Sequence, residues 1–364
     1  MKKQLPVWQS NQPTGRVFFL DLLKAMSIVA VVSYHSIFVP QSTYADSALF
    51  VDTLFAPLRF CVPVLLTISF LLFERGLINH PTKPTWSLIK KRLVRLAIPT
   101  LFWFGLAAAL KLLKANSPTA LIGGILTGEI FTGSYYLLIM FELLPLFILV
   151  RRWLDNLRNV LAVVLLQGLI YFLIHASLSG MFLPQIIPIL RTINRPLLAY
   201  WFVYIALGVF FYKNLPWLVR TSARIPAQFK ALSLFFTSLI LLAEYHYLKL
   251  ISGGSIPPFD YIMFSCILSV PVAFLCFASI EDNQLSVPYM RIVKLLSKYS
   301  LGIFCINGIL REILLSLGSY LFNEATFSLP EILAIKLIGW GLLLTISLGL
   351  SVLLERVGLR DVVC

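Results

Sequence analysis

The sequence has too little charge for a soluble protein of its length. Of its 364 residues, only 13% are Asp, Glu, Lys or Arg, whereas 59% are hydrophobic. Soluble domains usually carry about 25% charged and about 45–50% apolar residues. So few charges cannot cover a soluble surface of this size. The composition therefore excludes soluble globular, disordered and fibrous classes, and it predicts a polytopic membrane protein.

Cysteine patterns for disulfides or metal are also absent. The chain has five cysteines, four of them in apolar runs, and no pair has the CxxC spacing. A disulfide framework or a zinc ribbon is therefore not expected, and we predict no bound metal. We also find no internal repeat, no separate soluble domain and no cleavable signal segment.

Long hydrophobic runs are abundant instead. A helix needs about 20 mostly apolar residues to cross a bilayer. Ten such runs predict an all-α bundle of about ten transmembrane helices. The predicted spans are 17–39, 50–73, 93–113, 133–150, 159–177, 197–212, 229–248, 258–280, 298–318 and 332–354.

The basic residues between these runs predict the orientation. When the loops are assigned alternately to two sides, 21 Lys and Arg fall on one side and five on the other. Cytoplasmic loops carry the excess of Lys and Arg, so both termini are expected in the cytoplasm. We expect a plasma (inner) membrane protein with a cytoplasmic tail over 1–16, a ten-helix domain over 17–354 and a second tail over 355–364. The net charge of +14 then reflects topology rather than nucleic-acid binding.

A few ionisable side chains remain inside the predicted spans, where they are costly and mark candidate functional sites. Two of them, Arg311 and Lys336, lie near the outer ends of their spans and are expected to extend towards the interface. The other basic residues within spans are Lys24 and Arg59, and the notable acids are Asp21, Glu142 and Glu312.

The first span concentrates these groups on one face. Lys24 and His35 are eleven residues apart, which is about three helical turns, so they share a face about 16 Å apart along the axis. Asp21 precedes Lys24 by three residues on the same stripe. We expect Lys24 towards the cytoplasm, His35 towards the outer surface, and both side chains in one polar channel. The alternative is an Asp–Lys pair for helix packing with an interfacial histidine.

At this face the sequence resembles acyltransferase family 3, a family of integral-membrane acyltransferases that typically have ten spans. The stretch DLLKAMSIVAVVSYH (21–35) is similar to the Asp, Arg, ten residues, His pattern of the family, with Lys24 in place of Arg. Lysine keeps the charge but loses the bidentate fork of arginine. Similar stretches follow in family order over nearly the whole chain: VPVLLTISFLL (62–72), KKRLVRLAIPTLFW (90–103), YYLLIMFELLPLFIL (135–149) and SKYSLGIFCING (297–308).

The resemblance implies acyl transfer, most often O-acetylation, from a cytoplasmic acyl-CoA to a cell-surface polysaccharide or lipid-linked sugar. A hydroxyl nucleophile needs a general base at neutral pH, and histidine suits this role. We expect His35 to deprotonate the acceptor or to relay the acyl group. Glu142 is the candidate carboxylate partner, or else a packing carboxyl. Lys24 would hold the donor, and Asp21 would fix Lys24.

Further residues are candidates for substrate binding. Arg59 is expected to bind the acceptor or stabilise an oxyanion, or else to pair with Asp52 or Glu142. Ser69 and Asn307 would line the cavity or join helices by hydrogen bonds. A cluster of basic residues is expected to bind the phosphates of CoA. The excess of positive charge in cytoplasmic loops is an alternative explanation of the same cluster. This cluster consists of Lys90, Lys91, Arg92 and Arg95.

A second function class stays open, because a glycan exporter without acyl transfer would have a similar composition. Transporters often show paired halves with broken helices or inverted repeats. We see neither pattern in the sequence, which favours the enzyme.

Overall fold

The computed structural model describes residues 17–80, 84–113 and 117–364, and every regular element within them is a helix. Each of the ten predicted spans overlaps one of ten main helices. They are α1 (Phe18–Tyr34), α3 (Cys61–Ile78), α4 (Thr85–Leu113), α6 (Tyr135–Val150), α7 (Leu157–Leu178), α9 (Val203–Lys213), α11 (Ala227–Ile251), α12 (Phe264–Phe277), α14 (Ser300–Leu321) and α15 (Leu329–Arg356).

Shorter elements connect these helices. They are η2 (Gln41–Tyr44), α2 (Ala45–Leu54), η3 (Ala56–Phe60), α5 (Pro118–Leu126), η4 (Trp153–Asp155), α8 (Ile186–Ile193), η5 (Leu198–Tyr200), α10 (Leu215–Arg224), η6 (Asp282–Gln284), α13 (Val287–Lys298) and α16 (Arg360–Val363).

The helices have the length and apolarity of a polytopic membrane bundle. Within the described residues, six helical stretches are long and apolar enough to cross a bilayer: η3 with α3, α4, α7, α11, α14 and α15. The apolar helices α6, α9 and α12 are shorter. Helix α1 has 17 residues, about 25 Å at the α-helical rise. The predicted fold class is confirmed, whereas the orientation stays a prediction and the tail 1–16 lies outside the described residues.

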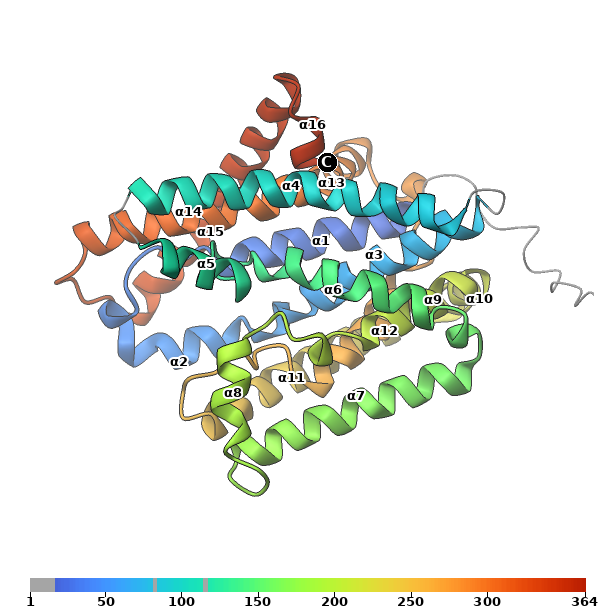
Figure 1. Ribbon diagram of the computed structural model, residues 1–364, viewed down its shortest axis with the longest axis horizontal. Coiled ribbons are helices and arrows are strands. Elements are labelled where there is room, and N and C mark those ends of the chain that lie inside the picture. Colours follow the sequence, from blue (N-terminus) through green and yellow to red (C-terminus); the bar gives the residue numbers. More distant parts are fainter. Residues whose placement is uncertain (1–16, 81–83, 114–116) are drawn as a thin grey trace, which may run out of the picture.

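Helix α1 occupies the interior of the bundle. The long helices lie roughly parallel to the long axis of the molecule, and α1 runs between α4 and α14 on one side and α2, α11 and α12 on the other (Figure 1). It packs against α3, α12, α13, α14 and α15. Its side chains Leu23, Ile28 and Val32 are completely buried. The candidate residues Asp21, Lys24 and His35 are therefore positioned by a helix that has protein neighbours on most sides.

The outer helices present apolar side chains to their surroundings instead. In α7, for example, Leu165 and Phe172 are 73% and 60% exposed. Exposed apolar surface of this extent is untypical of a soluble monomer and suits contact with lipid tails.

Two glycines allow α14 and α15 to pack closely against the segment that follows α1. An added Cβ at Gly318 of α14 would lie 1.8 Å from the Phe38 carbonyl oxygen, and one at Gly339 of α15 would lie 2.2 Å from the Ser36 carbonyl oxygen. Only glycine permits such close approach of a helix to another backbone. Residues 36–38 are therefore fixed between α14 and α15, directly after His35.

The C-terminal segment belongs to the bundle rather than to a separate tail. Helix α16 folds back onto α4, α14 and α15, and the Trp103 indole of α4 donates a hydrogen bond to the Val362 carbonyl oxygen at 2.8 Å. Val362 and Val363 are buried. The last residues thus pack on the helical core through their valines, whereas the boundary expected at residue 354 stays a prediction.

Candidate active site

Two cavities lie at opposite ends of α1. The first has a volume of about 770 Å³ and contains Lys24 near the start of α1. We call it the basic cavity. The second has a volume of about 500 Å³ and contains His35 directly after α1. We call it the histidine cavity. The expected single channel is thus two cavities, each holding one of the two predicted residues.

The basic cavity collects cations from four helices, α1, α4, α13 and α16. Its charged lining residues are Lys24, Arg92, Arg95, Lys298, Arg360 and Asp361. Ser69 of α3 also lines it, as expected, and its hydroxyl lies 3.4 Å from the Tyr136 hydroxyl. Buried Asp21 lies nearby on α1 and accepts a hydrogen bond from Ser297 at 2.6 Å.

The structure divides the predicted basic cluster. Helix α4 begins at Thr85, so these four cations lie on a helix rather than in a loop before it. Arg92 and Arg95 are three residues apart on one helical face, and both line the basic cavity. Lys90 and Lys91 are exposed and are not among its lining residues. Helical geometry therefore selects two of the four.

The charges of the basic cavity are only partly balanced. Lys298 forms an ion pair with Glu355 at 2.6 Å, and Arg360 lies 3.7 Å from the same carboxyl group. Among the described residues, Arg92 and Arg95 have no carboxylate within ion-pair distance. Their guanidinium groups are therefore available to an anion that enters the cavity.

In the histidine cavity, an amide orients the imidazole. The Nδ1 atom of His35 is in close contact with the Oδ1 atom of Asn307 on α14. The Asn307 amide nitrogen donates to the carbonyl oxygens of Ile303 at 2.6 Å and Phe304 at 2.9 Å, which turns its oxygen towards the ring. An amide oxygen at this place accepts a hydrogen bond from Nδ1–H, which leaves Nε2 as the basic nitrogen. Asn307 is fully buried and joins α14 to the end of α1.

The structure does not bring Glu142 to this histidine. Its side chain is exposed on α6, and it is not among the lining residues of either cavity. The partner of His35 is an amide on α14 rather than a carboxylate on α6. The sequence offered a weak signal for this pairing, because Asn307 lies in the apolar ninth span.

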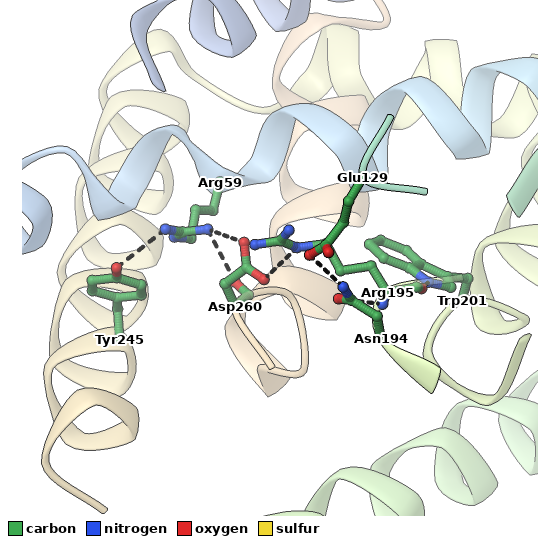
Figure 2. Close-up of polar contacts among 7 residues, drawn as sticks. All are labelled: Arg59, Glu129, Asn194, Arg195, Trp201, Tyr245 and Asp260. Atoms are coloured by element: carbon green, nitrogen blue, oxygen red, sulfur yellow. Dashed lines mark hydrogen bonds and ion pairs between the residues drawn. The ribbon is translucent and has the colours of Figure 1, made fainter. Parts of the chain in front are cut away.

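Arg59 belongs to a buried charge network. Its Nη1 atom lies 2.8 Å from Asp260 Oδ2, and the other oxygen of Asp260 lies 2.9 Å from Arg195 Nε. Arg59 also donates to the Tyr245 hydroxyl at 3.2 Å. Figure 2 shows Asp260 between the two guanidinium groups. The alternatives Asp52 and Glu142 are wrong as partners of Arg59, since Asp52 pairs with Lys249 at 2.7 Å.

Aromatic rings hold this network in place. The Arg59 guanidinium lies 4.9, 4.4 and 5.5 Å from the ring centroids of Tyr34, Tyr245 and Tyr261. Such cation–π contacts stabilise a desolvated cation. Arg59 is therefore fixed by one carboxylate and three rings in the wall of the histidine cavity.

Arg195 and Asp260 were missed by the sequence analysis. Arg195 precedes η5, and its carbonyl oxygen accepts a hydrogen bond from the Trp201 indole at 2.7 Å. Burial opposes its charge, but Asp260 and Tyr135 raise the pKa of its guanidinium above the ordinary value. Asp260 falls inside the predicted span 258–280, so its depth in the membrane marks it as a candidate in the same way as Asp21 and Glu142.

The expectation for Arg311 and Lys336 is wrong. Lys336 is only 4% exposed, and its ammonium donates to the Ser33 carbonyl oxygen at 2.6 Å. Arg311 donates to the Thr132 hydroxyl at 3.0 Å and lines the histidine cavity. Both side chains point into the protein, because α14 and α15 pack against the end of α1 and present these faces to it.

The linings of the two cavities approach each other at Phe304. Phe304 of α14 lines the basic cavity. A Cβ built on Gly133 would lie 3.1 Å from the Phe304 ring and 3.6 Å from Cε1 of His35. Tyr136 packs against Phe304 with ring centroids 5.2 Å apart. The Phe304 ring thus borders the basic cavity and lies near the imidazole of His35.

Residues suited to metal binding are not clustered. Within the described residues, no group of three or more His, Cys, Asp or Glu is placed to hold a metal ion.

Comparison with known proteins identifies one family. The model of the acyltransferase family 3, described as an acyltransferase domain, matches residues 17–356. The match includes α1, all ten predicted spans and the lining of the histidine cavity, but it ends before Arg360, Asp361 and Cys364 of the basic cavity. No curated protein and no solved structure gives a significant match.

Proposed function

Because the chain belongs to acyltransferase family 3 and is a membrane acyltransferase, we propose that it transfers an acyl group from acyl-CoA to a sugar hydroxyl. The donor occupies the basic cavity, and the acceptor occupies the histidine cavity. The acyl group, of which acetyl is the smallest candidate, crosses between them beside Phe304. The acceptor is part of a cell-surface polysaccharide or a lipid-linked sugar.

The charge of the basic cavity supports an acyl-CoA donor. CoA carries phosphates at one end and a thioester at the other. Arg92 and Arg95 lie at the start of α4 and bind the phosphates through charge-assisted hydrogen bonds. Lys24 lies further into the bundle on α1 and contacts the pantetheine chain near the thioester. Asp21 positions Lys24 from the preceding turn.

The lining of the histidine cavity supports a hydroxyl-rich acceptor. Tyrosine side chains and paired charges surround it, among them Tyr34, Tyr135, Tyr245, Tyr261, Arg59, Glu129 and Asp260. Tyrosine faces cover the apolar faces of a sugar ring, and their hydroxyls exchange hydrogen bonds with it. Fixed polar groups of this kind orient a ligand without rearranging.

The orientation of His35 supplies the chemistry. Its Nε2 atom removes the proton of the acceptor hydroxyl, and the oxygen attacks the thioester carbonyl carbon. The resulting tetrahedral intermediate collapses by breaking the C–S bond, and the CoA sulfur leaves and takes the proton from His35. Asn307 acts as a positioning residue, as the third group of a nucleophile–base–orienter set does. The His35–Asn307 contact beside the end of the basic cavity is the observation that carries this proposal.

Acyl transfer by purified protein tests the proposal. We expect His35→Ala to lower kcat about 10²- to 10⁴-fold, the usual contribution of a general base, with the KM for acetyl-CoA unchanged. The matched control is His246→Ala, which removes a histidine of α11 outside the lining of both cavities. The measurements are release of free CoA thiol and acyl incorporation into a surface-glycan extract.

Two outcomes would contradict the proposal. One is full acyl transfer by His35→Ala protein at normal membrane abundance. The other is intact acylation in cells together with loss of the surface glycan, which would support the exporter reading instead.

A further inference from the structure

A third cavity lies beside the histidine cavity and is not used by the proposed reaction. It has a volume of about 310 Å³ and lies among the end of α1, η2, α2, α14 and α15. It shares several lining residues with the histidine cavity: Tyr34, Gln41, Asp52, Arg59 and Arg311. We call it the side cavity. A ligand in the histidine cavity therefore borders it directly.

The side cavity has an excess of positive charge. Three cations line it, namely Arg59, Arg311 and Lys336, whereas the acid in its wall is Asp52. Asp52 already pairs with Lys249, which lines the histidine cavity. The charge of the three cations is therefore not balanced from within the side cavity.

Nearby acids offset this charge only in part. Asp260 is shared between Arg59 and Arg195, so one carboxylate serves two guanidinium groups. Glu312 follows Arg311 in the chain and accepts a hydrogen bond from Thr132 at 2.8 Å, on the side of the histidine cavity. Lys336 has a carbonyl oxygen and the Phe55 ring, 4.3 Å away, as its partners.

The arginines also have donors without partners. The Nε atoms of Arg59 and Arg311 are buried and have no hydrogen-bond partner among the described residues. Arg59 as a whole is only 9% exposed. Buried donors are paired in the great majority of cases, and each exception requires an explanation. Two such donors belong to cations of one cavity wall, so the hydrogen-bonding capacity of these arginines is not used up within the described residues.

We propose that the side cavity binds an oxyanion, a carboxylate or a phosphate group, carried by the acceptor. The inference rests on the proposed function and narrows the acceptor to an acidic or phosphorylated sugar. Its anionic group lies between Arg59, Arg311 and Lys336, and its hydroxyl lies at His35. Arginine forks match the paired oxygens of both anions, and Lys336 adds a point charge.

Direct binding to the purified full chain tests this subsite without acyl transfer. The probes are glucose, glucuronate and glucose 1-phosphate, measured by calorimetry in detergent at low and high salt. We expect at least one anionic sugar to bind about tenfold or more tightly than glucose, and the preference to shrink with salt. Tighter binding of glucuronate indicates a carboxylate, and tighter binding of glucose 1-phosphate indicates a phosphate. Equal binding of all three sugars would overturn the inference.

Variants that each remove one charge test whether the preference for anionic sugars arises in the side cavity. We expect Arg311→Gln to remove most of the preference for anionic sugars. Lys336→Gln is expected to reduce the same preference, so the test can still be made if Arg311→Gln fails to fold. The matched control is Arg191→Gln, which removes the same charge from an exposed residue of α8 and leaves the preference intact. A preference that survives both cavity variants would exclude the side cavity.

The sugar-binding experiment can refute the anion subsite without refuting the proposed function, and the acyl-transfer experiment can do the reverse. An anion preference without any acyl transfer would refute the proposed function and leave the subsite in place. Acyl transfer to a neutral sugar without anion preference would refute the subsite and leave the proposed function in place.

Discussion

The two cavities along α1 differ in how their charges are held. In the histidine cavity, Arg59 and Arg195 share Asp260, and Lys249 pairs with Asp52. In the basic cavity, Arg92 and Arg95 have no carboxylate within ion-pair distance among the described residues. Ion pairs thus hold Arg59, Arg195 and Lys249 in the first cavity, whereas Arg92 and Arg95 in the second are open to an anionic ligand. Rigidity at one end and open charge at the other suit a fixed reaction geometry and a polyanionic donor.

The largest expected effect is a loss of stability when the ion pairs of the histidine cavity are broken. Asp260→Asn leaves Arg59 and Arg195 close together without their shared carboxylate. Breaking a buried ion pair costs about 3–5 kcal/mol, so thermal unfolding in detergent is expected at a much lower temperature. The control is Asp282→Asn, which removes an exposed pair with Lys294 at 3.2 Å and is expected to cost about 1 kcal/mol or less. Equal losses would show that the network does not hold the histidine cavity together.

The next effect concerns the segment that positions His35. Gly339→Ala places a Cβ 2.2 Å from the Ser36 carbonyl oxygen, and such overpacking costs about 1–3 kcal/mol. We expect a lower unfolding temperature and a lower kcat, with the KM for the donor unchanged. Gly341→Ala on the same helix meets nothing within 4 Å and is expected to be neutral or stabilising by up to about 1 kcal/mol. A normal kcat for Gly339→Ala would show that residues 36–38 do not position His35.

Removing one charge from the basic cavity is expected to have a smaller effect, which is a loss of CoA affinity. Arg92→Gln is expected to weaken CoA binding about tenfold, since a hydrogen bond to a charged group contributes about 1.5–3 kcal/mol. Lys90→Gln removes the same charge from an exposed site on the same helix and is expected to change affinity less than about twofold. Calorimetric titration with CoA measures both. Equal weakening by the two variants would favour a diffuse surface field over a defined site.

The smallest effect sharpens the role of Lys24. Lys24→Arg keeps the charge and restores a bidentate fork, so CoA affinity is expected to stay the same or to rise a few-fold. Lys24→Ala is expected to weaken it. If titration gives one affinity for the wild type and both variants, Lys24 has no part in donor binding.

Much of the fold was predictable because a bilayer constrains sequences strongly. A spanning segment must satisfy its own backbone hydrogen bonds and be apolar over its length, so hydropathy alone places the helices. Each predicted span overlaps a helix, but Lys24 and His35 line two different cavities rather than the one channel expected from their eleven-residue spacing. The start of α4 was missed because its basic first turns are not apolar.

The partners within the site were less predictable. His35 meets Asn307 across 272 positions of the chain, and the meeting depends on how α14 packs against α1. Hydropathy does not report such packing. Arg59 had several acids within plausible reach, and only the fold selects Asp260 among them. For Arg311 and Lys336, sequence position gave the depth of each residue but not the direction of its side chain.

The position of Phe304 near both cavities has a consequence for the membrane itself. With α1 oriented as predicted, polar cavities at its two ends shorten the apolar path across the bilayer to the neighbourhood of this ring. In the proposed reaction an acyl group passes through the same region, which would then also have to stop protons and ions.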